Sequence, residues 1–578
     1  MRGRRTAAVA LALLATVGCT STNERASSVP ASSAPSPLKS AVEPTPTSDG
    51  GGTLRIVAGT PDSLDPARSY FPWMWNIMRL YTRTLVTYPA EPGPQGAELV
   101  PDLATGLGTP SDGGQTWTYT LKEDQRFEDG RAITSRDIKY GVERSFAADV
   151  IVGGPTYVVD LLDDPETPYA GPYLDPHPDR LGLATVETPD DLTVVFRLAR
   201  PYADFDHVMA LPSSSPVPRE ADTGADYGLA PVSSGPYQIT SIDPVAGITL
   251  DRNPHWDPAA DPVRTGLPDQ IEVRTGLSGP ERDQLLLGDA ADVDATSSGL
   301  RIDALPRVEA NSDLRERATE VTSGVMRVLA LPATVPPMDD AHCRRAVALA
   351  VDPAALAQAW DGGESVDVAH TLWPQSLPGY QPAIDTLAEM DRSAALATAR
   401  EELFACGQPD GFETVIATPN QPGPLGIATE VRELLADVGI EATVAGLDPA
   451  TYYGSGVGRP ENVAVAGFGV ILASWSGDFP APASFYAPLV SAVSPAGNAN
   501  FAQVASPELT ALVDSALGAT DAEVADEAWR AVDDLLVDTA AYLPLLEDRV
   551  VLLAGQRLRN AYVHVAYGGY DLAVVGVR

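Results

Sequence analysis

The sequence predicts an α/β fold with mixed sheets, divided into several lobes. At 578 residues the chain is longer than one hydrophobic core usually spans, so two or three domains are expected. Strand and helix patterns alternate in the second half of the chain, whereas the first half contains a hairpin pattern. This combination predicts parallel pairing in one part and antiparallel pairing in another. In such folds ligands bind at the carboxyl ends of strands and between domains.

The first 300 residues contain mainly short strands. Alternating or clustered apolar residues predict strands at 53–57, 192–198 and 271–274, and a hairpin formed by 235–237 with 247–253. A helix is expected over 73–85, with its aromatic residues crowded at the start. Residues 149–188 are rich in Asp, Pro and Gly, which favours a long surface excursion.

The clearest local pattern is a strand, a turn and a capped helix in the first quarter of the chain. Apolar side chains alternate with threonines over 116–121, which predicts a half-buried strand. Thr134 and Asp137 then resemble a capping box at a helix start. Apolar residues recur at i, i+4 and i+8 along this helix, and Lys139 is expected to pair with Glu143 on its outer face.

A βαβ unit is predicted between residues 414 and 444. A strand at 414–417 is followed by one apolar helical face, made of Ile427, Val431, Leu434, Leu435 and Val438. Gly439 is a plausible helix stop, and 440–444 is the next strand. Such a unit implies parallel strands and a right-handed crossover. Further amphipathic helices are expected at 342–350 and 391–406.

The N-terminus has the pattern of an export signal. Three arginines among the first five residues precede a short apolar run over 7–17, too short to span a bilayer as a mature helix. Residues 16–19 resemble a bacterial lipobox, with Thr16 where Leu is usual. We therefore expect 1–18 to be a signal peptide and Cys19 to be lipidated. The alternative is an ordinary secretory signal with an incidental cysteine.

A tether is expected after the lipidation site, so that 19–52 comprise the lipidated cysteine and a disordered linker. From residue 20 the composition is Ser, Thr, Pro and Ala, which cannot bury enough surface to offset its ordering entropy. No later run reaches the roughly 18 apolar residues of a membrane helix. The expected location is the extracellular face of a bacterial cell membrane, through the lipid anchor.

The chain is strongly acidic, with 78 Asp and Glu against 39 Lys and Arg and a net charge of −39. Such a surface repels phosphate backbones, so nucleic-acid binding is not expected. A solvated acidic surface is the simpler interpretation, and attraction of cationic ligands is the alternative. Export also favours a disulfide between Cys343 and Cys406, with two buried thiols as the alternative.

Motifs for catalysis and metal binding are missing. The sequence has no G-x-S-x-G, no phosphate loop and no H-E-x-x-H, and its six histidines are scattered without ligand spacing. Residues 454–458 resemble part of a dinucleotide loop but lack the strand and helix around it, so a flexible loop is expected. The acidic pairs 163–164 and 533–534 are expected on solvated faces. No cofactor, metal or catalytic residue is therefore expected, and the protein is not expected to be an enzyme.

Six motifs occur in the order and spacing of a known family. They are 51–55 with 63–66, then 100–104, 112–146, 234–237 with 252–254, 343–352 and 475–480. Together they resemble the bacterial extracellular solute-binding proteins of family 5, the oligopeptide- and dipeptide-binding lipoproteins of ABC importers. The resemblance covers the chain from about residue 51 to its end.

The resemblance implies a two-lobed fold like that of the periplasmic binding proteins (type II, large cluster C), with a hinge between lobes and an extra subdomain. The implied division is lobe I at 53–85, 201–300 and 546–578, the extra subdomain at 86–200, and lobe II at 301–545. The implied function is capture of solutes, most simply oligopeptides, by cleft closure and delivery to a membrane permease that a cytosolic ATPase drives. A monomer is expected.

The resemblance also implies a binding site. In oligopeptide-binding members the residue matching Asp478 pairs with the free amino group of the ligand. Trp475, with Ser474 and Ser476, is expected to line the same wall and to pair its backbone with an extended ligand. The weaker candidates are Trp373, Tyr380, Thr60 and Asp62. Alternatively, Trp475 belongs to the core and Asp478 caps a turn.

Other functions stay open at this point. Within the family, a nickel complex, a glycoside or another small solute could be the ligand, although the scarcity of histidine argues against metal. Outside it, a secreted hydrolase or a structural or signalling lipoprotein remains an alternative.

Overall fold

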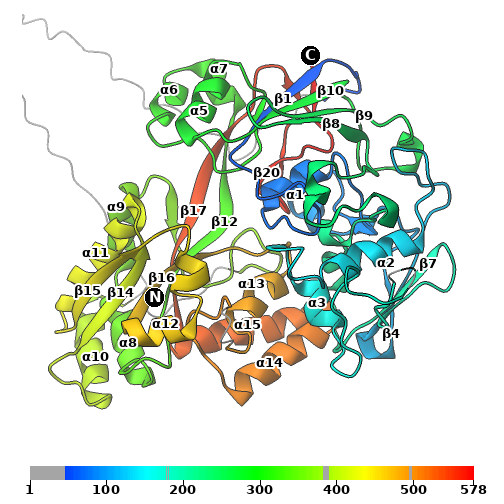
Figure 1. The fold of residues 1–578 in the computed structure, drawn as a ribbon. Coiled ribbons are helices and arrows are strands. Elements are labelled where there is room, and N and C mark those ends of the chain that lie inside the picture. The colour runs from blue at the N-terminus through cyan, green and yellow to red at the C-terminus, as the bar shows by residue number, and fades with distance from the viewer. Residues whose placement is uncertain (1–45, 178, 180, 382–389, 494–497) are drawn as a thin grey trace, which may run out of the picture. The chain divides into compact units, whose positions relative to one another are not determined.

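Two large sheets form the centres of two lobes in the computed structural model (Figure 1). The structure describes residues 46–578 except 178, 180, 382–389 and 494–497. The expected signal peptide, lipidated cysteine and most of the tether lie outside these residues. Across the described part of the chain, no helix has both the length and the apolar character needed to cross a membrane.

The first predicted strand lies in the five-stranded sheet of lobe I, between two strands that run parallel to it. Its order is β11 (Val293–Asp294), β1 (Thr53–Val57), β10 (Gln270–Arg274), β9 (Gly247–Arg252) and β8 (Tyr237–Asp243). Strand β1 runs parallel to β10 and β11, and β8 and β9 form the predicted antiparallel hairpin. Leu54 and Ile56 are fully buried, as the strand pattern requires.

A four-stranded antiparallel sheet forms a separate layer between residues 109 and 197. Its order is β4 (Thr109–Ser111), β5 (Thr116–Thr120), β7 (Thr193–Arg197) and β6 (Val186–Glu187). Helix α2 (Ser135–Arg144) begins at the predicted capping box, where Asp137 Oδ2 accepts bonds from both the backbone N–H and the hydroxyl of Thr134. Strand, cap and helix are thus confirmed.

The pair expected on the outer face of α2 is buried instead. Lys139 and Glu143 are 7% and 0% exposed, with Nζ and Oε1 3.8 Å apart. The segment after residue 180 covers this face, and the backbone N–H of Leu183 donates to Glu143 Oε1 at 2.9 Å. Burial raises the pKa of Glu143 to about 8. The helical spacing predicts the pairing of Lys139 with Glu143 correctly. It does not reveal which distant segment covers that face of the helix.

The six-stranded sheet of lobe II mixes parallel and antiparallel pairs. Its order is β13 (Val366–Val368), β17 (Tyr542–Leu553), β12 (Ala318–Ala330), β16 (Phe468–Trp475), β14 (Glu413–Pro419) and β15 (Glu441–Leu447). Strands β14 and β15 are parallel and joined by α11 (Pro422–Ala436), which confirms the βαβ unit.

Helices pack on both faces of this sheet. One face buries Leu329 and Val470 against α8 (Ala341–Ala350), α9 (Pro353–Asp361), α10 (Arg392–Ala405) and α11. The opposite face buries Val328 and Ala473 in a cluster shared with α13 (Pro482–Leu489), α14 (Pro507–Gly518) and α15 (Ala522–Asp538). The alternation of side chains along β12 and β16 separates these two cores.

Strands β12 and β17 run side by side from one lobe to the other (Figure 1). At one end, Ala318 and Leu553 join a cluster with Val57 of β1, together with α5 (Gly279–Leu287), α6 (Leu305–Glu309) and α7 (Ser312–Arg317). At the other end, Leu329 and Leu545 lie in the core of lobe II. Their pairing is interrupted between Thr322 and Met326, where Gly324 has φ of 75°. This irregularity is a natural bending point between the lobes.

The helix expected over 73–85 is shorter than predicted. Helix α1 covers Pro72–Met78 only. The carbonyl groups of Leu80 and Tyr81 accept bonds from the backbone of 234–237 at the start of the distant hairpin. Because these two carbonyl groups bond to the hairpin segment, they are not available to continue the helix, which ends before them.

The excursion at 149–188 is also not purely superficial. It contains α3 (Tyr157–Leu162), whose Val158, Leu161 and Leu162 are buried. Asp533 departs from expectation too, because it is buried and accepts bonds from Tyr486, Thr371 and the backbone of Leu372.

Short elements complete the described chain. The strands are β2 (Val86–Thr87), β3 (Val100–Pro101), β18 (Leu558–Arg559), β19 (Val563–His564), β20 (Gly569–Tyr570) and β21 (Gly576–Val577), and the helices are α4 (Phe205–Met209) and α12 (Pro460–Ala466). Single helical turns occur at Gly93–Ala97, Asp112–Gly114, Pro212–Ser214, Arg219–Ala221, Gly224–Leu229, Pro258–Ala260 and Tyr452–Gly456.

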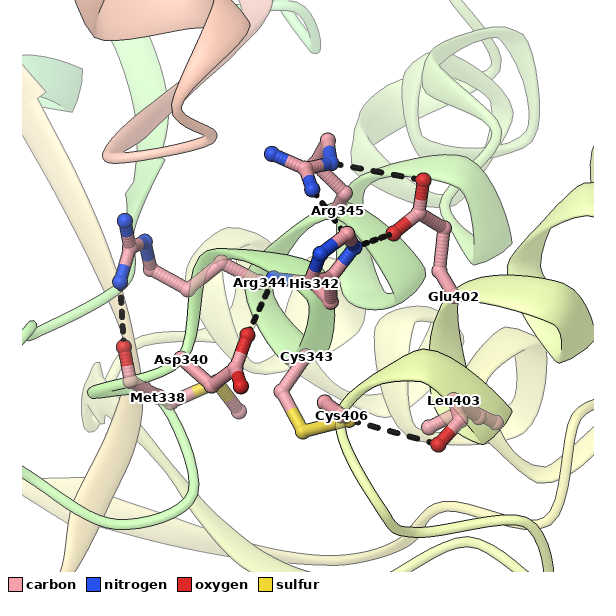
Figure 2. Close-up of a disulfide and its surroundings, with 9 residues drawn as sticks. All are labelled: Met338, Asp340, His342, Cys343, Arg344, Arg345, Glu402, Leu403 and Cys406. Atoms are coloured by element: carbon pink, nitrogen blue, oxygen red, sulfur yellow. Dashed lines mark hydrogen bonds and ion pairs between the residues drawn. A yellow bond between two sulfur atoms is a disulfide. The ribbon is translucent and has the colours of Figure 1, made fainter.

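A disulfide joins Cys343 of α8 to Cys406 at the end of α10, with Cα atoms 5.5 Å apart (Figure 2). Around it, the carboxylate of Glu402 accepts from the side chains of His342 and Arg345 (Figure 2). The two helices are therefore held together both covalently and by an ion-paired group on the adjacent surface.

Replacing both cysteines by serine should lower the free energy of unfolding by about 2–4 kcal/mol, because a loop spanning 63 residues is released in the unfolded chain. Urea unfolding of the double variant and of the native protein measures this difference. Two free thiols in the unfolded, unreduced native protein would contradict the bond.

Candidate functional site

The carboxylate of Asp478 lies where lobe II meets segments from the first 200 residues. It follows the end of β16, and its Oδ2 accepts hydrogen bonds from the hydroxyl groups of Tyr70 at 2.8 Å and Tyr157 at 2.7 Å. Tyr70 lies two residues before the start of α1, and Tyr157 begins α3. Two phenols from separate elements thus converge on one oxygen of a single acid.

Asp478 has no cationic partner among the described residues, and the hydrogen bonds to its carboxylate come from the two phenols. Burial raises its pKa to about 6, although the bonds from Tyr157 and Tyr70 act in the opposite direction. Burial and the nearby Asp478 also raise the pKa of both phenols well above the ordinary value. Both tyrosines therefore stay protonated donors at neutral pH.

Phe479 adds an aromatic contact beside this acid. It is 2% exposed, and its ring lies 5.5 Å from that of Tyr157 and stacks on His207 at 5.3 Å with 11° between the planes. Burial lowers the pKa of His207 to about 4, and the hydroxyl of Tyr88 is 2.9 Å from its Nδ1. The ring of Phe479 is therefore held between neutral aromatic groups.

A cavity of about 20 Å³ adjoins Asp478 and is lined also by Trp75, Arg79, Tyr88 and Tyr567. That volume holds about one water molecule. A peptide does not fit into this cavity in the conformation described.

Two of the other predicted residues of this wall, Trp475 and Ser474, are already engaged. Trp475 pairs with Met326 of β12, and its Nε1 donates to the carbonyl of Phe485 at 2.9 Å. The backbone N–H of Ser474 donates to the hydroxyl of Tyr453 at 2.9 Å. A ligand that pairs with this backbone would have to displace Tyr453, which is 39% exposed. Ser476 is half-buried.

Asp62 belongs to the site indirectly. Its carboxylate accepts from the backbone N–H of Ser63 and Tyr70 and from the hydroxyl of Ser69. It therefore shapes the loop that presents Tyr70 to Asp478. Thr60, in contrast, is exposed.

The remaining two candidates lie in the 373–380 loop. Trp373 is 3% exposed, donates from Nε1 to the carbonyl of Pro378 and meets Tyr486 edge-on, so it packs as a core residue. Tyr380 is partly buried, and its backbone N–H donates to Leu377. Neither has a direct contact with Asp478 among the described hydrogen bonds.

Tyr70, Tyr157 and Phe479 were not predicted as site residues. Two signals were available: Tyr157 begins a short apolar run inside 149–188, and Phe479 lies inside the family motif 475–480. Metal binding finds no support in the described ranges, where no group of three or more His, Cys, Asp or Glu side chains could hold an ion.

Comparison with known proteins identifies the scaffold. The family model described as "Bacterial extracellular solute-binding proteins, family 5 Middle" matches residues 98–496. The probable D,D-dipeptide-binding periplasmic protein DdpA of Escherichia coli K12 is 23% identical over 523 residues, covering 87% of this chain and 90% of that protein. The glutathione-binding protein GsiB of Salmonella typhimurium is 21% identical over 474 residues, covering 80% and 83%.

Solved structures agree with this scaffold. The "Clavulanic acid biosynthesis oligopeptide binding protein 2" has 42% identity and a TM-score of 0.89, covering 94% of this chain and all of that one. DppA from Helicobacter pylori, in complex with the peptide STSA, has 19% identity and a TM-score of 0.68, covering 92% and 99%. The fold is that of the type II periplasmic binding proteins, which confirms the predicted two-lobed class.

Replacing Asp478 by Asn should stabilise the unliganded protein by about 1 kcal/mol at about pH 7.5. The folded pKa of about 6 exceeds the ordinary 3.8, so the contribution of Asp478 to stability is largest below pH 3.8 and is lost as pH rises through 6. Asparagine can accept the same phenol bonds without this loss. The magnitude is kept small because the side chain is only partly buried.

Urea unfolding at about pH 7.5 and about pH 4.5 tests this, with the gain expected to shrink at the lower pH. Equal destabilisation by the substitution at both pH values would show that ionisation of Asp478 does not cost the folded protein stability.

Proposed function

The chain belongs to family 5 of the bacterial extracellular solute-binding proteins, and we propose that it captures oligopeptides for an ABC importer. The family match spans residues 98–496, and the structure with 42% identity is named an oligopeptide-binding protein. Peptide capture also suits a site with an acid at the contact between lobes. In this role the protein performs no chemistry and supplies selectivity through binding.

The observation that carries this proposal is the carboxylate of Asp478, held by two neutral donors and no cation among the described residues. The free amino group of a peptide is an ammonium ion that can donate up to three hydrogen bonds. A charge-assisted bond to a carboxylate is about twice as strong as a neutral one. A peptide ammonium can therefore compete with the phenols of Tyr70 and Tyr157 for Asp478.

Opening and closing would take place around β12 and β17. We place the bending point at Ser323–Val325, where the pairing of the two strands is interrupted. A micromolar ligand corresponds to about 8 kcal/mol of binding free energy, part of which is offset by closing the lobes. The closed, loaded form would then be recognised by the membrane permease.

The lobe boundaries proposed from the sequence need one adjustment. We assign 53–85, 201–322 and 546–578 to lobe I and 86–200 to the extra subdomain. Because α6 and α7 pack with Val57 of β1, we begin lobe II at the interruption in β12 instead of at residue 301.

We further propose that Cys19 carries the lipid anchor and that the chain up to residue 46 is the tether. Its far end is fixed to lobe I, since the backbone N–H and carbonyl of Thr47 pair with the side-chain amide of Asn560 at 2.8 and 3.0 Å. The 28 positions from Cys19 to Pro46 span at most about 100 Å when fully extended. The body would thus remain within reach of a permease in the same membrane.

Peptide capture predicts dependence on a free amino group. Isothermal titration of the ligand-free protein with a tetrapeptide and its N-acetylated form should show the acetylated form binding roughly 10- to 100-fold more weakly. In the Asp478→Asn variant this preference should largely disappear. The matched control is Asp514→Asn, which removes an exposed charge from α14. Equal affinity for both peptides in the native protein would refute the amino-group role.

Affinity for the free-amine peptide should fall roughly tenfold between about pH 7 and about pH 5, because Asp478 titrates at about 6 and accepts an ammonium only when ionised. The N-acetylated peptide should lack this dependence. The same calorimetry at both pH values measures it, and a parallel fall for both peptides would point to a different titrating group.

Lipidation predicts that Cys19→Ala moves the protein from the membrane fraction to the soluble or secreted fraction. Cell fractionation with immunodetection measures the change. Unaltered membrane association of the variant would rule out the anchor at Cys19.

A further inference from the structure

The segment before α4 touches lobe II directly. The backbone N–H of Ala203 donates to the carbonyl of Leu517, near the end of α14, at 2.7 Å. Pro201 on the same segment approaches Gly518 of that helix. Side chains from 202 to 204 are therefore placed at a contact between the lobes, and any change in lobe separation changes their surroundings.

Asp204 is an acid without a partner at this contact. It occupies the N-cap position of α4, but its side chain makes no capping hydrogen bond. It also forms no ion pair with any described residue. Burial raises its pKa to about 6, with a further contribution from Asp526 of α15 across the contact. Asp526 itself has a partner, Arg530, at 3.6 Å.

Tyr202 supplies a second and independent observation. Its side chain is 3% exposed, and its hydroxyl is buried without a hydrogen-bond partner among the described residues. Leaving such a group unsatisfied costs about 1–3 kcal/mol. After burial, the groups that act on its pKa are Asp204, Arg200, Asp478 and Asp160, so the phenol lies among acids from both lobes.

The nearby cations do not neutralise these acids. Arg530 is engaged with Asp526, with the carbonyl of Gly379 and with the ring of Trp373. Arg200 is exposed and forms no ion pair with a described acid. When the lobes close, the acids of the two lobes come closer and their repulsion raises the free energy of the closed form. A bound cation removes that cost.

We propose that Asp204 and Tyr202 form a second cation subsite, in addition to Asp478, and that the ligand is a peptide whose first or second residue has a basic side chain. This rests on the proposed peptide capture and narrows its ligand class. The peptide ammonium would bind Asp478, while the side-chain cation would donate hydrogen bonds to the carboxylate of Asp204 and to the hydroxyl oxygen of Tyr202. Because an extended chain advances about 3.5 Å per residue, a long basic side chain from either position can reach beyond the amino terminus.

Two acids, Asp478 and Asp204, also allow lobe closure itself to discriminate between peptides with basic and with neutral side chains. With a neutral side chain, Asp204 stays desolvated without compensation when the lobes meet. With a lysine or arginine side chain, the same desolvation is offset by a charge-assisted bond. Discrimination would then arise from the differing cost of closing the lobes on the two ligands.

The experiment uses two tripeptides of nearly equal shape, lysyl-alanyl-alanine and norleucyl-alanyl-alanine, titrated calorimetrically at about pH 7.5. The native protein should bind the lysyl peptide roughly tenfold more tightly, since a charge-assisted bond contributes about 1.4 kcal/mol or more. Asp204→Asn should remove this preference and leave the affinity for the norleucyl peptide unchanged. Tyr202→Phe should reduce the preference severalfold and fold normally, because the lost hydroxyl has no described partner.

The matched control is Asp163→Asn, which removes an exposed acid at the end of α3 and should leave both affinities unchanged. Equal binding of both peptides by the native protein, or an equal loss for both in Asp204→Asn, would overturn the subsite while leaving peptide capture intact. Failure of the native protein to bind either peptide would overturn peptide capture itself, and the subsite with it.

Discussion

The central constraint on this protein is a carboxylate, partly withdrawn from water, that lies where the lobes meet and has no cationic partner among the described residues. Within the described part of the chain, Asp478 is held by the hydroxyl groups of Tyr70 and Tyr157, which offer hydrogen bonds but no charge. The raised pKa of Asp478 has the same origin, because burial disfavours the ionised form and no cation compensates for it among the described residues. A site of this kind is stable enough to persist without ligand and still has more to gain from an ammonium ion. That difference is what a capture protein needs.

The rest of the fold positions this acid and allows it to move. Strand β16 carries Asp478 just beyond its last residue, and the buried face beneath α13 to α15 fixes that strand in lobe II. The partners Tyr70 and Tyr157 come from segments that precede residue 200 and are anchored elsewhere. Because β12 and β17 link the two cores and are irregular between them, the acid and its phenols can separate without disturbing either core.

The local parts of this structure could be predicted from the sequence, and the long-range parts could not. The capping box at Thr134 and the βαβ unit were predicted correctly because neighbouring residues determine them. Asp478 was named only through a family motif. Tyr70 and Tyr157 are separated from it by 408 and 321 residues, so no periodicity could connect them. The burial of Glu143 was missed for the same reason, since a distant segment covers its helix.

A crystal structure with a bound free-amine peptide would show directly whether Asp478 binds the ligand's amino group. We predict that the peptide nitrogen lies within about 3.2 Å of a carboxylate oxygen of Asp478 and that at least one of the two phenols no longer donates to it. A complex in which Asp478 keeps both tyrosine bonds while the peptide ammonium binds elsewhere would contradict it.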